Sequence, residues 1–222
     1  PRRTAVKEAK PVYFICMRVD VEARVIANTR LSTDYNVVSL AAPEIAGAAA
    51  PGQFVMIKPG RGHDPLLRRP FSVFEILREH GQAIGLSLLS KRIGVTTALL
   101  FDSVEGDVVS CLGPLGRPFT VVGPPQEACM VAGGVGLAPF VTLTEALAAR
   151  HTPMTMIYGA RSAAELFHLD WFRSQGVRLV LATEDGSAGE RGRVTAPLER
   201  ELRQARPPGM MVYACGPEPM LE

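Results

Sequence analysis

The residue pattern changes at Gly123-Pro124-Pro125, and this change constrains the fold more than any other feature. Before it, short alternating runs rich in β-branched residues are separated by Gly and Pro, which is typical of antiparallel strands. After it, apolar strands alternate with helical stretches, which is typical of βαβ units around a parallel sheet. A chain of 222 residues can bury two cores of about a hundred residues each. We therefore expect two domains joined at this segment.

The first region is expected to form an antiparallel β-barrel. The predicted strands are residues 23–29, 35–41, 53–58, 71–77, 83–89 and 107–112. Residues 94–101 have Thr followed by helix formers, which predicts a short inserted helix whose N-terminus is a potential anion site. Residues 1–21 are predicted to be an N-terminal arm, because their charges form a small basic cluster of the kind found in solvated segments.

The second region is expected to form an α/β domain with a parallel sheet covered on both faces. Its predicted strands are residues 128–132, 154–158, 177–182 and 210–214, and its predicted helices are residues 137–150, 163–172 and 195–205. The expected domains are therefore 22–122 and 126–222. The sequence begins without Met and stops where a further helix starts to form, so we expect the C-terminus to be incomplete.

Composition excludes several classes of function. The 24 Lys and Arg residues nearly balance 22 Asp and Glu residues, so the net charge of +2 lacks the positive field that binding to a nucleic acid backbone needs. No apolar run reaches the roughly 18 residues of a membrane span, and no secretory leader pattern is present, so we expect a cytoplasmic protein. The cysteines are scattered, which predicts neither a metal site nor a disulfide framework: Cys16, Cys111, Cys129 and Cys215.

A glycine-rich turn follows the first apolar strand of the second region. It reads Ala132-Gly133-Gly134-Val135-Gly136-Leu137-Ala138-Pro139 and opens a helical stretch. Glycines lack Cβ, so the backbone can approach a pyrophosphate, and the free N–H groups at a helix start favour its negative charge. Pro139 suits the first helical turn. Tight packing explains such a turn equally well, so other features must decide between the two interpretations.

Three further glycine-containing corners follow later strands of this region. They are Tyr158-Gly159-Ala160-Arg161, Thr183-Glu184-Asp185-Gly186-Ser187 and Tyr213-Ala214-Cys215-Gly216-Pro217-Glu218-Pro219-Met220. In open α/β sheets ligands bind beyond the carboxyl ends of the strands, so these corners predict a binding crevice. Each corner alone also fits an ordinary turn. Cys215 alone fits a small buried core residue better than a ligand contact.

A second cluster of polar residues lies at strand ends of the first region. It consists of Leu67-Arg68-Arg69-Pro70-Phe71-Ser72-Val73, Leu89-Ser90-Lys91 and Gly94-Val95-Thr96-Thr97. An Arg, a short hydroxyl residue and a capped helix start can together hold a diphosphate and the edge of an isoalloxazine ring. Taken alone, the two Arg residues fit a solvated strand end better.

Taken together, these motifs resemble the ferredoxin–NADP⁺ reductase superfamily. Arg69-Pro70-Phe71-Ser72 is similar to its Arg-x-(Tyr/Phe)-(Ser/Thr) flavin motif, Gly133-Gly134-x-Gly136-x-Ala138-Pro139 to its pyridine-nucleotide loop, and Cys215-Gly216-Pro217 to its nicotinamide motif. The three motifs occur in family order and spacing over about residues 22–222. The joint match favours ligand binding over the structural alternatives for Arg69, the glycine-rich turn and Cys215.

Within the superfamily, the sequence most resembles the electron-transfer subunit of heterotetrameric, NAD-dependent dihydroorotate dehydrogenase. The segments that carry this are Asp64-Pro65-Leu66-Leu67-Arg68-Arg69-Pro70-Phe71-Ser72, Leu112-Gly113-Pro114-Leu115-Gly116, the glycine-rich turn and Thr183-Glu184-Asp185-Gly186-Ser187. Related subunits of ferredoxin:NADP oxidoreductases and sulfhydrogenases share much of this sequence. The resemblance implies an FAD-dependent NAD(P)H oxidoreductase subunit of pyrimidine biosynthesis. Its partner would be a catalytic dihydroorotate-oxidising subunit or a ferredoxin-type acceptor.

The resemblance also implies a role for each site residue. Arg69 would pair with the FAD pyrophosphate and Ser72 would bond near flavin N5, with the cofactor also lined by Pro70, Phe71, Leu89, Ser90, Lys91, Gly94, Thr96 and Thr97. NADH would lie across Gly133, Gly134, Val135, Gly136, Leu137, Ala138 and Pro139, with Arg161, Thr183, Glu184 and Asp185 toward its adenosine half and Cys215, Gly216 and Pro217 beside its nicotinamide. The flavin supplies the reactivity, so no catalytic acid, base or nucleophile is expected. The histidines therefore receive structural or surface roles: His63, His80, His151 and His168.

Glu184 and Asp185 near the expected ribose would repel a 2′-phosphate, which predicts NADH rather than NADPH, although Arg191 and Arg193 nearby weaken this inference. The family subunit carries a [2Fe–2S] cluster on clustered cysteines after its Cys-Gly-Pro motif. Such a cluster is expected here only in a segment after Glu222, because the dispersed cysteines lack the required spacing. Two alternatives stay open: a stand-alone NAD(P)H:flavin or ferredoxin oxidoreductase, and a non-enzymatic nucleotide sensor on the same scaffold.

Overall fold

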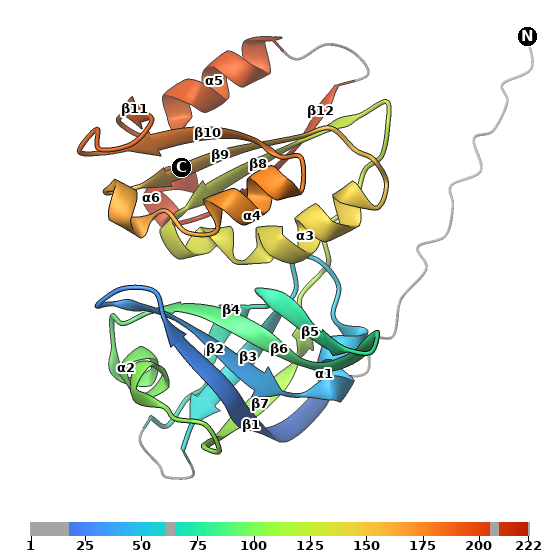
Figure 1. Cartoon of the computed structure of the whole chain (residues 1–222), viewed down its shortest axis with the longest axis vertical. Helices are drawn as coiled ribbons and strands as arrows, with labels where there is room; N and C mark the ends of the chain where they lie inside the picture. The colour runs from blue at the N-terminus through green and yellow to red at the C-terminus, as the bar shows by residue number, and fades with distance from the viewer. Residues whose placement is uncertain (1–17, 61–64, 205–208, 222) are drawn as a thin grey trace, which may run out of the picture.

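The computed structural model describes residues 18–60, 65–204 and 209–221, which form two stacked domains (Figure 1). Most of the predicted arm, together with Cys16, His63 and Asp64, lies outside the described residues. Within those ranges no helix is long and apolar enough to cross a membrane.

The first domain is built on a seven-stranded antiparallel sheet, in the order β4-β3-β7-β1-β2-β6-β5. The strands are β1 (Val19–Arg30), β2 (Tyr35–Ala41), β3 (Phe54–Pro59), β4 (Arg69–Ser72), β5 (Glu75–Glu79), β6 (Gln82–Lys91) and β7 (Val108–Leu115). The edge strands β4 and β5 are consecutive in the chain. Between them, Val73 N donates to Gln53 O (3.1 Å) and Phe74 N donates to Ser87 O (2.9 Å). The chain thus passes from one edge of the sheet to the other, and the sheet forms a half-barrel around its apolar core.

Three details of the barrel differ from the sequence prediction. The predicted strand 71–77 is two strands, because the chain leaves one sheet edge and joins the other at Val73 and Phe74, both buried (2% and 0% exposed). The first strand starts at Val19 rather than after the predicted arm 1–21, since Val19 pairs with Gly113 of β7. The short helix α1 (Pro43–Ala48) was not predicted, whereas α2 (Val95–Asp102) matches the predicted inserted helix.

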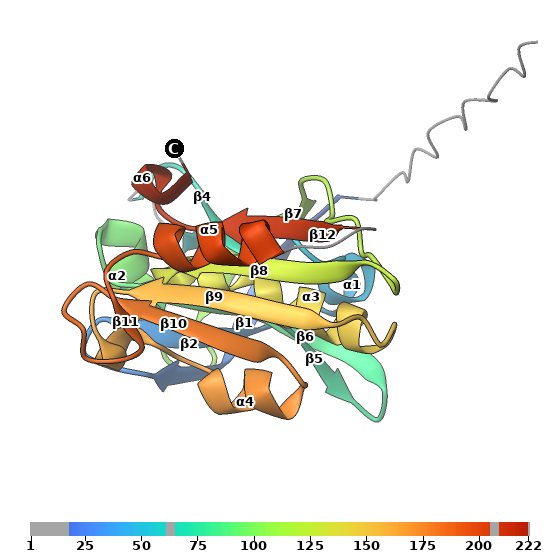
Figure 2. The same ribbon diagram turned by 90° about the horizontal axis from the view of Figure 1, so that it is seen from above.

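The second domain is a five-stranded sheet in the order β11-β10-β9-β8-β12, with every neighbouring pair parallel. The strands are β8 (Glu127–Gly133), β9 (Met154–Ala160), β10 (Arg178–Thr183), β11 (Glu190–Arg191) and β12 (Met210–Cys215). Helices α3 (Pro139–Ala148) and α4 (Leu169–Ser174) cover the face toward the barrel, and α5 (Thr195–Gln204) covers the other (Figures 1 and 2). Strand order reverses at β8, which lies between β9 and β12. This reversal creates the crevice where α/β sheets bind ligands.

The predicted helix 163–172 is broken. It forms the 3₁₀ turn η2 (Ala163–Glu165), a non-helical link and then α4, which begins after His168 in the left-handed region (φ 61°). The link is used for tertiary contact instead, because Leu166 and Phe167 pack against the core that joins the domains. The predicted helix 137–150 is also shorter, since its start is the 3₁₀ turn η1 (Gly134–Leu137) and α3 runs only to Ala148.

The two domains share one apolar core. Val37, Phe74 and Leu89 of the barrel are buried in the same cluster as Leu137 and Phe140 of the α/β domain. Helix α3 lies between the parallel sheet and the barrel (Figure 1). Because burying apolar surface disfavours separation of the halves, this core holds the glycine-rich turn against the barrel.

Candidate functional site

The glycine-rich turn and the Cys-Gly-Pro corner lie in direct contact. β8 and β12 pair in parallel with Ala132 opposite Cys215, so both strands end at the same edge. A Cβ on Gly136 would lie 2.2 Å from the Cys215 carbonyl oxygen, and one on Gly133 would lie 2.9 Å from Pro217 Cδ. The glycines are therefore needed for close approach of the two motifs. The structure brings together two of the three groups of residues that the sequence assigned to NADH.

Gly134 has a different reason to be glycine. Its backbone is in the left-handed region (φ 54°), and a Cβ there would meet nothing within 4 Å. The backbone at this point of the loop is thus open on its outer side. Pro139 lies in the first turn of α3, as its fixed φ favours. Free backbone at a helix start is the arrangement that binds a pyrophosphate.

The Arg161 and Glu184 corners are tied to each other at the ends of β9 and β10. Glu184 N donates to Ala160 O and Asp185 N donates to Arg161 O, each at 3.1 Å. The side chains of Arg161, Glu184 and Asp185 are exposed. Hydrogen bonds from the Ser187 hydroxyl and N–H lower the pKa of Asp185, so its charge persists at neutral pH. This corner presents a carboxylate pair to any ligand lying beyond the strand ends.

Thr183 is buried, and its hydroxyl is used inside the protein. It donates to Ala188 O (2.8 Å) and accepts from Ala188 N (3.0 Å). The contact of the Thr183 side chain with the dinucleotide stays a prediction. Its observed partners fix the turn that carries Glu184 and Asp185.

In the barrel, Arg68 and Arg69 have different environments. Arg68 Nη2 contacts both carboxylate oxygens of Asp20 (2.7 and 2.9 Å) and Ser110 Oγ (2.6 Å), so this side chain fastens β4 to the sheet. Arg69 is exposed, with one long hydrogen bond (3.5 Å) to the Arg68 carbonyl. Its guanidinium is therefore available for an anion. Ser72 ends the same strand, half-buried and paired with Phe54 of β3.

The end of β6 carries the second part of the predicted flavin site. Leu89 is 4% exposed and lies in the core shared by both domains. Ser90 is 1% exposed, and its Oγ has no hydrogen-bond partner among the described residues. Buried polar atoms normally have a partner, and the Oδ1 of Asn36, which lies opposite Ser90 on β2, also lacks one among the described residues. Both atoms are closed off from solvent. Lys91 Nζ lies 3.4 Å from Glu165 Oε1 of the other domain.

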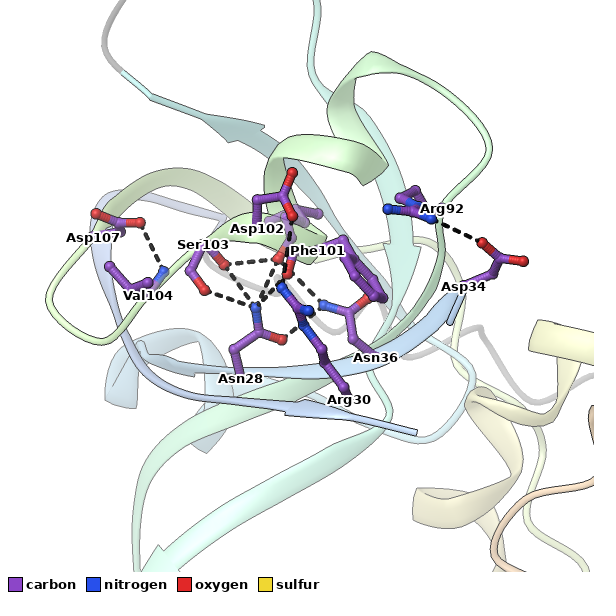
Figure 3. A network of polar contacts seen from close by, with 11 residues as sticks. Asn28, Arg30, Asp34, Asn36, Arg92, Phe101, Asp102, Ser103, Val104 and Asp107 are labelled. Carbon is purple, nitrogen blue, oxygen red and sulfur yellow. Dashed lines mark hydrogen bonds and ion pairs between the residues drawn. The ribbon is translucent and has the colours of Figure 1, made fainter. Parts of the chain in front are cut away.

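Helix α2 is fixed by two asparagines that the sequence analysis did not single out (Figure 3). Asn28 Nδ2 donates to the carbonyls of Leu100 (3.0 Å), Phe101 (3.1 Å) and Ser103 (2.8 Å). Asn36 Nδ2 donates to the Leu100 carbonyl (3.2 Å) and to Asn28 Oδ1 (2.8 Å). The carbonyls at a helix end lack partners within the helix, so these amides fasten α2 to β1 and β2. No local pattern marks these asparagines, because their partners are distant in the sequence.

The start of α2 faces outward. Thr97 Oγ1 accepts from Ile93 N (2.9 Å) and Gly94 N (3.0 Å), while Thr96 is 5% exposed. The hydroxyl of Thr97 thus caps the helix, and Gly94 leaves the backbone exposed. A capped helix start of this kind is compatible with the predicted phosphate contact through backbone N–H groups.

The two predicted half-sites meet across the domain interface. The turn η1 of the glycine-rich loop lies against β6, and Leu137 of η1 shares the buried core with Leu89. A flavin held along β6 and a dinucleotide held along η1 would therefore be neighbours. The residues fit these groups: glycines permit a close backbone approach at the loop, and Arg69 offers an exposed guanidinium with one long hydrogen bond to the Arg68 carbonyl. Among the described residues, no group of His, Cys, Asp and Glu side chains is arranged to hold a metal ion.

Comparison with known proteins identifies the family. Residues 130–222 match the family "Oxidoreductase NAD-binding domain". A dihydroorotate dehydrogenase B (NAD(+)) electron transfer subunit from Desulforamulus reducens is 36% identical over 201 residues, which cover 90% of this chain and 75% of that protein. Its counterpart in Geobacillus thermodenitrificans is 37% identical over 83% of this chain and 70% of its own length. The chain belongs to this family of electron transfer subunits.

Solved structures agree with the fold of the family. The NADH-dependent reduced ferredoxin-NADP oxidoreductase superposes with a TM-score of 0.77 at 27% identity, over 90% of this chain and 70% of that one. A ferredoxin NADP⁺ reductase from Neisseria gonorrhoeae superposes with a TM-score of 0.74 at 20% identity, over 90% of this chain and 87% of its own. The predicted family and the predicted reductase fold, with an FAD-type β-domain followed by an NAD-type α/β domain, are confirmed. The chain is an oxidoreductase module of electron-transfer type.

Proposed function

We propose that this chain moves electrons between NAD(H) and a partner redox subunit through FAD, in the oxidation of dihydroorotate for pyrimidine biosynthesis. The observation that carries the proposal is the contact of η1 with β6, which makes neighbours of the predicted dinucleotide loop and the predicted flavin strand. Membership of the family supports the substrate and the partner, since the relatives are named as electron transfer subunits of dihydroorotate dehydrogenase B (NAD(+)).

The proposed role of the protein is to position FAD and the nicotinamide dinucleotide relative to each other. FAD, when bound, supplies a ring that exchanges hydride with a nicotinamide and passes electrons on. Arg69 would bind its diphosphate, Ser72 would bond to its polar atoms, and the β6 segment that contains Ser90 would line it. The backbone of Gly134 and Gly136 would bind the dinucleotide diphosphate. Hydride transfer then requires alignment of two rings, which the shared interface core maintains.

Cys215 would lie beside the nicotinamide as a packing group. Burial raises the pKa of its thiol, so the sulfur is protonated at neutral pH. A thiol is a poor nucleophile compared with a thiolate. The proposed role is therefore to shape the nicotinamide pocket without reacting.

The exposed carboxylates of Glu184 and Asp185 support NADH as the dinucleotide. They would bond to ribose hydroxyls and repel the 2′-phosphate of NADPH. Anaerobic flavin reduction with each dinucleotide tests this choice. Saturation of the reduction rate at a lower concentration of NADPH than of NADH would contradict it.

Three measurements test the proposal as a whole. The purified protein is expected to be yellow, to contain FAD, and to be bleached by NADH in the absence of oxygen. Co-expression with a dihydroorotate-oxidising subunit is expected to yield a stable complex that reduces NAD⁺ with dihydroorotate. A yellow protein that forms no such complex and reduces free flavin or ferredoxin would favour a stand-alone reductase, and one that takes up no FAD would favour a nucleotide sensor. The cytoplasmic location, the domain limits and an iron–sulfur cluster after Glu222 stay predictions.

A further inference from the structure

Glu165, the last residue of the turn η2, joins the two domains through its carboxylate. Tyr35 Oη of β2 donates to Glu165 Oε2 at 3.0 Å, and Lys91 Nζ of β6 lies 3.4 Å from Glu165 Oε1. Both partners belong to the barrel, whereas Glu165 follows β9 of the α/β domain. One side chain of the dinucleotide-binding domain thus holds two strands of the other domain.

The barrel side of this contact is ordered by close packing. Tyr35 is 2% exposed, and its ring lies 4.9 Å from that of Phe167. Lys91 Nζ also lies 4.7 Å from the Tyr35 ring centroid, a distance at which a cation is attracted to the ring face. Burial and the nearby Glu165 charge raise the pKa of Tyr35, so its hydroxyl keeps the proton that it donates. Tyr35, Lys91 and Glu165 therefore have little freedom to move independently of one another.

The other side of the contact leads to the glycine-rich loop. Tyr158 of β9 is fully buried, and its Oη lies 3.2 Å from the Glu165 carbonyl and 3.5 Å from the Gly134 carbonyl. Phe167 N donates to the same hydroxyl at 3.5 Å. A continuous set of polar contacts therefore runs from Gly134, through Tyr158 and Glu165, to Tyr35 and Lys91.

A second interdomain contact is independent of Glu165. His168 Nε2 lies 3.5 Å from Glu75 Oε1, and the His168 ring is 4.8 Å from that of Phe74. Together with the apolar interface, this contact is expected to keep the domains associated when Glu165 is changed. A variant at Glu165 would therefore test alignment of the domains rather than folding.

We propose that Glu165 is a positioning residue for hydride transfer, holding the glycine-rich loop in register with the cofactor strand β6 through its contacts with Tyr35 and Lys91. This inference rests on the proposed function. It gives the task of aligning the two bound ligands to a side chain outside the predicted site. Reacting atoms must lie about 3 to 3.5 Å apart, and a displacement of about 1 Å costs roughly 100-fold in rate. Loosening the Glu165 contact would allow such a displacement without removing either ligand's own binding groups.

The test is anaerobic stopped-flow reduction of the FAD-loaded protein over a range of NADH concentrations. Glu165→Gln keeps the shape and loses the charge that attracts Lys91, and Tyr35→Phe removes only the hydroxyl. We expect Glu165→Gln to lower the limiting reduction rate by about 10- to 100-fold, with the NADH dissociation constant within about twofold of wild type. Tyr35→Phe should lower the rate less. The double variant should be no slower than Glu165→Gln, because both changes act on one contact.

Glu199→Gln is the matched control, since Glu199 pairs with Arg203 within α5, away from the barrel. It should reduce at the wild-type rate. A wild-type protein that binds FAD but is not reduced by NADH would overturn the proposed function itself. A reducible wild type with a Glu165→Gln variant of equal limiting rate would overturn only this inference. A variant changed in NADH affinity or thermal stability alone would also overturn it.

Discussion

Replacing Gly136 by Ala tests whether the dinucleotide loop must touch the Cys-Gly-Pro corner. The new Cβ would lie 2.2 Å from the Cys215 carbonyl oxygen, 2.6 Å from its carbonyl carbon and 2.8 Å from Gly216 Cα. All three are backbone atoms, and the two of Cys215 belong to the paired strand β12, so no side chain can turn away to make room. Ordinary carbon–oxygen contacts are about 3.3 to 3.6 Å, which requires the loop and the corner to separate by roughly 1 Å.

That separation sets the expected magnitudes. Overpacking of this kind typically costs about 1 to 3 kcal/mol of stability, so the variant is expected to fold with a lower unfolding midpoint. A shift of about 1 Å at the nicotinamide is expected to slow hydride transfer by roughly 100-fold. The FAD content should not change, because the barrel strands of the flavin site are untouched. Urea unfolding, flavin absorbance and anaerobic stopped-flow reduction measure the three quantities on one preparation.

Gly47→Ala is the matched control, because a Cβ at this position of α1 would meet nothing within 4 Å. It should leave the reduction rate unchanged and leave stability equal or slightly higher, as Ala is the better helix former. The reasoning would be refuted if Gly136→Ala were reduced by NADH at the wild-type rate with wild-type affinity.

Three further predictions concern the barrel and its interface. Arg69→Ala should weaken FAD binding about 10- to 100-fold, because a charge-assisted hydrogen bond contributes about 1.5 to 3 kcal/mol. A fluorescence titration measures the FAD affinity, and a wild-type affinity would contradict the proposed contact of Arg69 with the diphosphate. Asn28→Ala should lower the free energy of unfolding by about 1 to 3 kcal/mol in urea, since carbonyls at the end of α2 lose their donor. Glu75→Gln should be less stable than wild type at pH 7, with the difference vanishing on acidification. His168 lowers the pKa of Glu75 below its ordinary 4.5, so the stabilisation is present above that value and is lost as pH falls through the folded pKa. A melting-temperature difference that stays constant from pH 7 to pH 3.5 would contradict this last prediction.

The parts of the fold that local chemistry determines were predictable. The glycine-rich turn and Pro139 form a strand-to-helix loop because backbone freedom and a fixed φ are properties of those residues themselves. The inserted helix α2 and four strands of the parallel sheet were predicted for the same reason. Their apolar periodicity and punctuation by Gly and Pro belong to short stretches of sequence.

What escaped prediction depends on partners distant in sequence. The segment 163–172 has a helical composition, yet it breaks because Leu166 and Phe167 pack into the interdomain core. Asn28 and Glu165 were not singled out from the sequence, because their partners lie 72 and 130 residues away along the chain. Tertiary contact overrides local propensity at such positions.

Some of the ionisable groups with shifted pKa values lie at the contact between the domains. Several ionisable groups away from this contact also have shifted pKa values, among them Cys111, Cys129 and Asp185. Tyr35, Glu75 and Tyr158 have shifted pKa values too, and these three lie at or beside the contact between the domains. None of them is placed to give or take a proton from a nicotinamide, which needs neither acid nor base to transfer hydride. Their shifts instead record buried polar groups that hold one domain against the other. In a reaction whose rate depends on the distance between two rings, such contacts supply the alignment that acid–base residues cannot.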